Sequence, residues 1–207
     1  MTIKAVVFDI GNVLIHWDPV PFYDNLIGPE RRKQLFEQTG LDEMNELVDL
    51  GHPFRQTIYD WADKHPEWRE EIRMWHDHWI EFARPEIPLS VHLMKALQAK
   101  GIAVISLSNF GVDSYDYAAT FYPFLREFDQ DFVSGHMRVI KPDPEIYAML
   151  EAKTKLSGAE LIFTDDRADN IFAASERGWK THLFTDPEGW AARLVAEGLL
   201  TEAEAQP

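Results

Sequence analysis

Short, continuous apolar runs alternate with amphipathic stretches along the chain. Four runs rich in β-branched and aromatic residues are predicted to be strands, at residues 5–8, 102–107, 161–164 and 181–184, with 128–133 as a weaker fifth. They lack polar alternation, which is typical of strands covered on both faces. Helical patterns lie between them. This order predicts an α/β fold with a doubly wound parallel sheet.

Two of the predicted helices have clear boundaries. Apolar residues recur at helical spacing from Ile87 to Leu97, and the Lys100-Gly101 pair predicts where that helix ends. Asp143 precedes Pro144, so a helix is predicted to begin there with aspartate as its N-cap and proline at its first position.

The alternation is interrupted between residues 16 and 84, where no run is typical of a strand. Five apolar residues there recur at spacings of four, three, four and three, which predicts a helix with one buried face: Trp68, Ile72, Trp75, Trp79 and Phe82. We therefore predict a helical subdomain at 16–84, inserted into a core formed by 1–15 and 85–207. The polar tail, 201–207, is expected to fray.

Composition then excludes several kinds of protein. The 207 residues include no cysteine, which excludes disulfide-stapled scaffolds, thiolate metal sites and cysteine nucleophiles. The 20 basic and 35 acidic residues give a net charge of −15, which argues against a nucleic-acid partner. No apolar run approaches the length of a membrane span, and the first residues do not resemble a secretory signal, so we expect no membrane partner and a cytoplasmic location.

Polar residues stand at the ends of the predicted strands. Asp9 follows the first strand, Ser108 and Asn109 follow the second, and Asp165 and Asp166 follow the strand at 161–164. In a parallel sheet these ends meet at one edge, which is where ligands bind.

Lys141, in the loop before the Asp143 helix, can join that group. Clustered carboxylates suit a hard cation such as Mg²⁺. A free carboxylate, a cation, a lysine and a hydroxyl together indicate a phosphoryl-transfer site.

Four segments, in the expected order, resemble the motifs of the haloacid dehalogenase-like (HAD) superfamily. They are Phe8-Asp9-Ile10-Gly11-Asn12-Val13-Leu14-Ile15, Leu107-Ser108-Asn109, Lys141-Pro142-Asp143-Pro144-Glu145-Ile146-Tyr147 and Phe163-Thr164-Asp165-Asp166-Arg167-Ala168-Asp169-Asn170. The helical insertion resembles the C1-type cap of this superfamily, over a Rossmann-like core. The first motif, followed by Trp17-Asp18-Pro19, is most similar to that of sugar-phosphate phosphatases of the glucose-1-phosphatase type.

The resemblance implies a role for each motif residue. Asp9 would attack phosphorus and carry an aspartyl-phosphate, while Ser108, Asn109 and Lys141 would bind or shape the phosphoryl pocket. Mg²⁺ would be held by Asp9, the Gly11 carbonyl and Asp166. Asp165 would either touch the metal or only orient its neighbour. The implied reaction is hydrolysis of a small phosphorylated metabolite.

Gly11 departs from the common phosphatase pattern, which has a second aspartate two residues after the nucleophile as the general acid and base. His16 or Asp18 is a candidate replacement. Trp17, Trp75 or Trp79 is a candidate for stacking on a sugar.

Alternatives stay open at this point. One is a 2-haloacid dehalogenase that uses Asp9 as its nucleophile. That reaction needs no metal, and related dehalogenases typically carry an aromatic residue at the position of Gly11. Another is a catalytically silent member that binds a phosphometabolite or a protein partner. A response-regulator receiver is disfavoured, because its acidic pair follows the first strand. An apolar cap patch would serve either a homodimer or the core of the cap itself.

Overall fold

The computed structural model describes residues 2–207 and contains one sheet of five parallel strands. The strands are β1 (Ala5–Phe8), β2 (Ala103–Ser108), β3 (Gln130–Val133), β4 (Leu161–Asp165) and β5 (Lys180–Leu183). Their order in the sheet is β3-β2-β1-β4-β5, and every neighbouring pair is parallel. The predicted α/β class and all five predicted strands, including the weaker one at 128–133, are confirmed.

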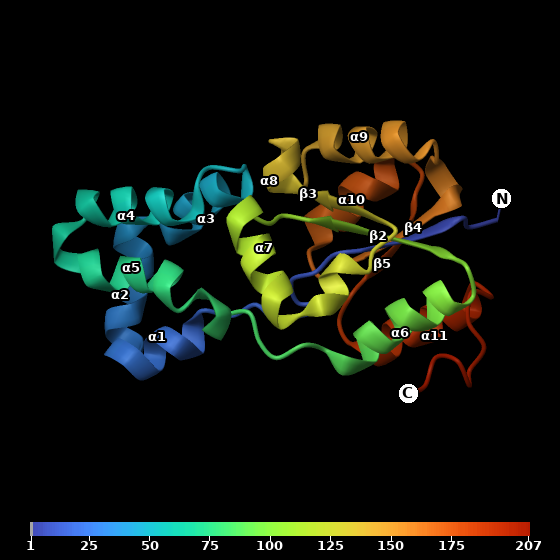
Figure 1. Ribbon diagram of the computed structural model, residues 1–207, viewed down its shortest axis with the longest axis horizontal. Coiled ribbons are helices and arrows are strands. Elements are labelled where there is room, and N and C mark those ends of the chain that lie inside the picture. Colours follow the sequence, from blue (N-terminus) through green and yellow to red (C-terminus); the bar gives the residue numbers. More distant parts are fainter. Residues whose placement is uncertain (1) are drawn as a thin grey trace.

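Both faces of the sheet are covered, which explains why its strands have no polar alternation (Figure 1). Side chains alternate along a strand, so Val6 and Phe8 pack in one cluster while Ala5 and Val7 pack in another. All four residues of β1 are fully buried. The central strand therefore ends inside the protein, directly before Asp9.

Six helices belong to the part of the chain that follows residue 87. They are α6 (Pro88–Ala99), α7 (Val112–Phe121), α8 (Ser134–Met137), α9 (Pro144–Thr154), α10 (Ala168–Glu176) and α11 (Pro187–Ala196). Apolar residues of α6, α7 and α11 pack in the cluster of Phe8, and those of α9 and α10 pack in the cluster of Val7. Asp143 caps α9 by accepting a hydrogen bond from the Glu145 amide, as predicted.

Five helices lie between β1 and α6 in the sequence and form a separate group beside the sheet (Figure 1). They are α1 (Val20–Ile27), α2 (Pro29–Thr39), α3 (Leu41–Asp49), α4 (Phe54–Lys64) and α5 (Arg69–Asp77). We call this group the cap. Figure 1 shows that α3 lies at the side of the cap that faces α7 and α8.

The helix predicted from the tryptophan spacing is broken. Its five apolar residues are all buried, but α5 covers only Arg69–Asp77, and the rest forms 3₁₀ turns at Pro66–Trp68 and Trp79–Glu81. The chain leaves the helix at His78, and Trp79 then packs against Trp17 with ring centroids 5.4 Å apart. Tertiary contacts with a distant aromatic residue thus override the local period.

The expected fraying of the tail is also wrong. Ala205 is buried, and the Glu204 carboxylate accepts a hydrogen bond from Lys100 Nζ at 2.8 Å. His92 of α6 contacts the Glu204 carbonyl as well, so the tail is tied to that helix. Within residues 2–207, no helix is both long and apolar enough to cross a bilayer.

Candidate active site

The carboxyl ends of the three central strands bring the predicted residues together. Asp9 directly follows β1, Ser108 is the last residue of β2, and Asp165 is the last residue of β4. Because β1 lies between β2 and β4, these residues are neighbours although they are far apart in sequence. Lys141 reaches the same place from the loop between α8 and α9.

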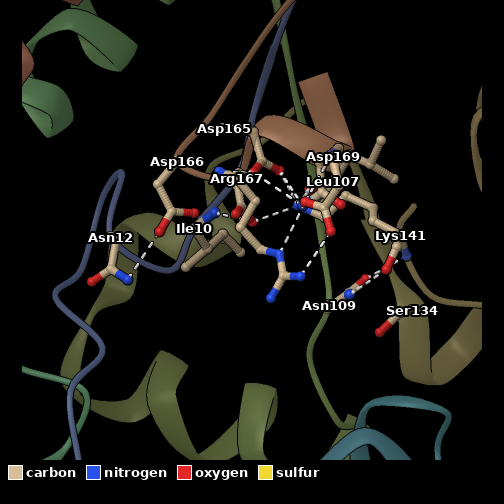
Figure 2. Close-up of polar contacts among 12 residues, drawn as sticks. Ile10, Asn12, Leu107, Asn109, Ser134, Lys141, Asp165, Asp166, Arg167 and Asp169 are labelled. Carbon is tan, nitrogen blue, oxygen red and sulfur yellow. Dashed lines mark hydrogen bonds and ion pairs between the residues drawn. The ribbon is translucent and has the colours of Figure 1, made fainter. Parts of the chain in front are cut away.

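The Lys141 ammonium lies at the centre of this group and is buried. Its Nζ lies 2.9 Å from Asp9 Oδ1 and 2.6 Å from Asp165 Oδ2, and it donates to the Leu107 carbonyl at 2.9 Å. Figure 2 shows the contacts of Asp165 and Leu107 converging on the amine. Removing charges from water is costly unless they are paired, and here one cation satisfies two carboxylates that would otherwise repel each other.

Burial and pairing act against each other on the ionisation of this group. Burial raises the pKa of Asp9 to about 7, although the positive charge of Lys141 opposes the shift. Burial disfavours the charged form of Lys141, but Asp165 and Asp9 outweigh it and hold the Lys141 pKa above its usual value. The lysine is therefore a fixed positive charge beside Asp9.

The two adjacent aspartates occupy different surroundings. Asp165 is fully buried, and both its oxygens accept hydrogen bonds from Asn170 Nδ2 at 3.0 Å, while Oδ1 also accepts from the Arg167 amide. Asp166 is only partly buried and lines a pocket, and burial raises its pKa. Asp165 is thus well placed to hold the Lys141 ammonium in position, and Asp166 to contact a ligand in the pocket.

The donor atoms fit a hard divalent cation. One carboxylate oxygen from each of Asp9, Asp165 and Asp166 lies within 4.8 Å of the other two. Oxygen-only donors of this kind suit Mg²⁺.

Asn12 is a site residue that the sequence reasoning missed. Its Nδ2 donates to Asp166 Oδ2 at 3.1 Å, and its Oδ1 accepts from the Trp17 amide at 2.9 Å. The backbone of Asn12 is left-handed, with φ of 54°, a conformation that asparagine tolerates better than most residues. An asparagine in the turn after the strand, within the first motif, was the available signal.

Asn109 holds the backbone of Lys141. Its Nδ2 donates to the Lys141 carbonyl at 2.9 Å, and its Oδ1 accepts from the Lys141 amide at 2.7 Å. Both ends of the side-chain amide are therefore engaged, which fixes the loop that carries the lysine. Ser108 is buried at the same strand end, and its hydroxyl lowers the Asp9 pKa against the effect of burial.

A pocket of about 760 Å³ opens over this group, between the sheet and the cap. Asp9, Ser108 and Lys141 line it on the sheet side, and three predicted aromatic residues line it on the cap side: Trp17, Trp75 and Trp79. Gly11 lines it too. A Cβ at Gly11 would meet only Trp17 Cβ, at 3.9 Å, so the pocket has room for a side chain there.

Of the two candidates for the missing acid, only His16 lines this pocket, and its side chain is exposed. Asp18 instead accepts a hydrogen bond from the Val20 amide at the start of α1 and lines a neighbouring groove.

The sequence of residues 3–178 matches the family model for haloacid dehalogenase-like hydrolases. The chain belongs to this family. Residues from the four HAD-type motifs thus meet at the edge of the sheet, and the predicted membership of the HAD superfamily is confirmed.

Two curated relatives span nearly the whole chain. A sesquiterpene phosphatase from Aspergillus oryzae is 26% identical over 192 residues, covering 89% of this chain and 91% of the relative. A D-ribitol-5-phosphate phosphatase from Bacteroides thetaiotaomicron is 23% identical over 203 residues, covering 93% and 97%.

A solved structure of a HAD-family enzyme from Bacteroides thetaiotaomicron has the same fold. It superimposes with a TM-score of 0.76 at 21% identity, and the match covers 94% of this chain and 99% of that one. A variant of that enzyme was solved in complex with magnesium and inorganic phosphate.

Proposed function

We propose that this HAD hydrolase is a Mg²⁺-dependent phosphatase that acts on a small phosphorylated metabolite through an aspartyl-phosphate on Asp9. The observation that carries the proposal is the buried Asp9–Lys141 pair at the floor of a pocket that also contains Asp166. In this proposal Asp9 is the nucleophile, Lys141 the fixed cation and Asp166 the metal-binding carboxylate, and all three line the same pocket. The two curated relatives named above, both phosphatases, support the reaction class.

The chain's own residues divide the work. Asp9 Oδ attacks phosphorus, Lys141 offsets the charge on the phosphoryl oxygens, and Ser108 binds one of those oxygens. Asn109 keeps Lys141 in place through its two backbone hydrogen bonds. Asp9, the Gly11 carbonyl and Asp166 would hold Mg²⁺, which when bound would supply the charge neutralisation that lets an anion approach an anionic phosphate.

The pocket walls favour a polyhydroxylated leaving group, so we propose a sugar or polyol phosphate. Tryptophan faces suit sugar rings, and the cap adds Asp42, Asn45 and Glu46 as hydrogen-bonding groups. The rival is an apolar ester such as a terpenyl phosphate. All proposed site residues come from one chain, so the proposed reaction does not depend on whether the apolar patch of the cap serves a homodimer or the core of the cap.

Phosphate release from sugar phosphates, a polyol phosphate, farnesyl phosphate and p-nitrophenyl phosphate tests the proposal, with Mg²⁺ and with EDTA. We expect EDTA-sensitive release, a preference for the polyhydroxylated esters, and none with Asp9→Asn. Preference for farnesyl phosphate would overturn the substrate class. If a folded enzyme released halide from a 2-haloacid without metal and no phosphate, it would be a dehalogenase; if it released neither, it would be a silent binding member.

A further inference from the structure

A phosphatase needs a proton donor for an alkoxide leaving group, and Gly11 cannot supply one. The acid must face the pocket, lie beside the phosphoryl site, and hold a proton near neutral pH. Beside the phosphoryl site, Asp9, Lys141 and Asp166 already have roles, and the side chain of His16, which also lines the pocket, is exposed to solvent. The cap side is therefore the place to look.

We infer that Asp49, the last residue of cap helix α3, is the general acid and base of this reaction; the inference rests on the proposed phosphatase function. Asp49 lines the pocket together with Asp9 and Lys141. It is partly buried, whereas the other acidic cap residues of the pocket, Asp42 and Glu46, are exposed.

The end of α3 is held firmly against the sheet domain. Ser134 Oγ donates to the Asp49 carbonyl at 2.6 Å, and Arg138 Nη1 donates to the Gly51 carbonyl at 2.6 Å. Gly111 allows this close approach, because a Cβ there would lie 2.5 Å from Val48 Cγ1. These contacts fix the Asp49 backbone between two elements that both border the site.

The Asp49 side chain is positioned as well. Asn45, one turn earlier on α3, donates from Nδ2 to Asp49 Oδ2 at 3.0 Å. The same Asn45 accepts a hydrogen bond from Trp75 Nε1, which ties the pair to the aromatic wall of the pocket. The carboxyl is thus oriented from within the cap.

Burial, aided by two nearby negative charges, keeps Asp49 protonated near neutral pH. Burial raises its pKa to about 8, and the negative charges of Glu46 on its own helix and Asp9 at the sheet edge add to the shift. Lys141 and the Gly111 amide, at the sheet edge and before α7, oppose it. The other charged group at this end of α3 is Arg138, directly after α8, whose guanidinium donates to the Gly51 carbonyl. An acid in this range can both give and take a proton at pH 7.

The proton balance closes over two steps. As Asp9 Oδ bonds to phosphorus, the bond from phosphorus to the ester oxygen breaks, and that oxygen takes the proton of the Asp49 carboxyl. The Asp49 carboxylate then takes a proton from a water whose oxygen bonds to phosphorus. The bond from phosphorus to Asp9 breaks, and phosphate leaves.

Asp49→Asn tests this inference with two substrates whose leaving groups differ in basicity. For an alkyl phosphate that the wild-type enzyme hydrolyses, kcat/KM should fall about 100-fold or more, the usual worth of a general acid. For p-nitrophenyl phosphate, which needs no protonation, kcat/KM should change less than about threefold. Its kcat should fall, with a burst of nitrophenolate, because water attack on the phosphoenzyme becomes slow.

The pH profile separates a proton-transfer role from a structural one. Wild-type kcat/KM for the alkyl ester should decline above about pH 8, and Asp49→Asn should lose that decline. Asp49→Glu, which keeps an acid, should regain part of the activity together with the decline. Glu43→Gln, which removes a charge from an exposed position of α3 outside the pocket, is the control and should behave as wild type.

An equal loss on both substrates, or no loss on either, would overturn the assignment of Asp49. Those outcomes leave the proposed function intact as long as the wild type releases phosphate and Asp9→Asn does not. A wild type that hydrolyses no ester refutes the phosphatase proposal, and with it the role given to Asp49.

Discussion

Replacing Lys141 by methionine removes the positive charge that lies between two buried carboxylates while keeping most of the side-chain volume. The ammonium contacts Asp9 at 2.9 Å and Asp165 at 2.6 Å, and it is only 1% exposed. Breaking a buried pair by removing one partner costs about 3–5 kcal/mol. For a chain of this size each kcal/mol lowers Tm by about 2–4 °C, so we expect a loss of about 6–20 °C.

The pH dependence of this loss identifies its electrostatic origin. Burial already raises the Asp9 pKa to about 7, and without the lysine this carboxyl gains still more from protonation. A raised folded-state pKa stabilises the folded protein at low pH, and that stabilisation is lost as pH rises through it. The deficit of Lys141→Met relative to wild type should therefore be larger at pH 8 than at pH 5.5.

The assay is thermal unfolding in EDTA, so that no bound cation substitutes for the missing charge. Lys4→Met is the matched control, because it breaks a surface pair with Glu160 and should lower Tm far less than Lys141→Met does. A Lys141→Met deficit as small as that of the control, or one that does not grow from pH 5.5 to pH 8, would refute the electrostatic account of the site.

Three further predictions concern single contacts. Asn12→Gly keeps the left-handed backbone but removes the hydrogen bond to Asp166, so the Mg²⁺ concentration for half-maximal activity should rise about tenfold. Asn12→Ala should have the same effect and should also lower the unfolding free energy by about 1 kcal/mol. An unchanged Mg²⁺ requirement in both variants would contradict the role of Asn12. Burial raises the pKa of Asp49 to about 8, so the folded protein keeps a proton that the unfolded chain releases near pH 4. Between these pH values the unfolding free energy of the wild type should fall, relative to that of Asp49→Asn, by at most about 1.4 kcal/mol per pH unit. Parallel stability curves of the two proteins in denaturant titrations would show that the shift is absent. Gly11→Asp places a carboxyl where a Cβ has room. In the Asp49→Asn background it should raise kcat/KM for the alkyl phosphate at least about tenfold, whereas Gly11→Ala should restore none. Equal values for the two double variants would argue against Asp49 as the acid that replaces one at position 11.

The sheet and its acidic edge could be predicted because the signals are local. Uninterrupted apolar runs mark buried strands, and the parallel order then forces Asp9, Ser108 and Asp165 to one edge. Lys141 follows from the motif that resembles the third HAD motif. The predicted boundaries of the inserted subdomain, 16–84, and the roles of the individual site residues remain predictions for the experiments above.

The remaining features depend on packing between distant segments, which no local pattern encodes. The Asn12 amide reaches Asp166, 154 residues away, only because the backbone turns left-handed after β1. Asp49 faces the pocket because Gly111 lets α3 approach the sheet domain. The helix predicted across Trp79 breaks because that ring packs on Trp17.

The central claim is that phosphate passes through Asp9, and trapping the phosphoenzyme tests it most directly. The enzyme is mixed with p-nitrophenyl phosphate and Mg²⁺ and quenched in acid within the first turnovers, and its peptides are analysed by mass spectrometry. Asp49→Asn should accumulate more of the intermediate than wild type. We predict one added phosphoryl group on the peptide that contains Asp9, absent from Asp9→Asn. Turnover without any phosphorylated peptide, or with the group on another residue, would contradict the account.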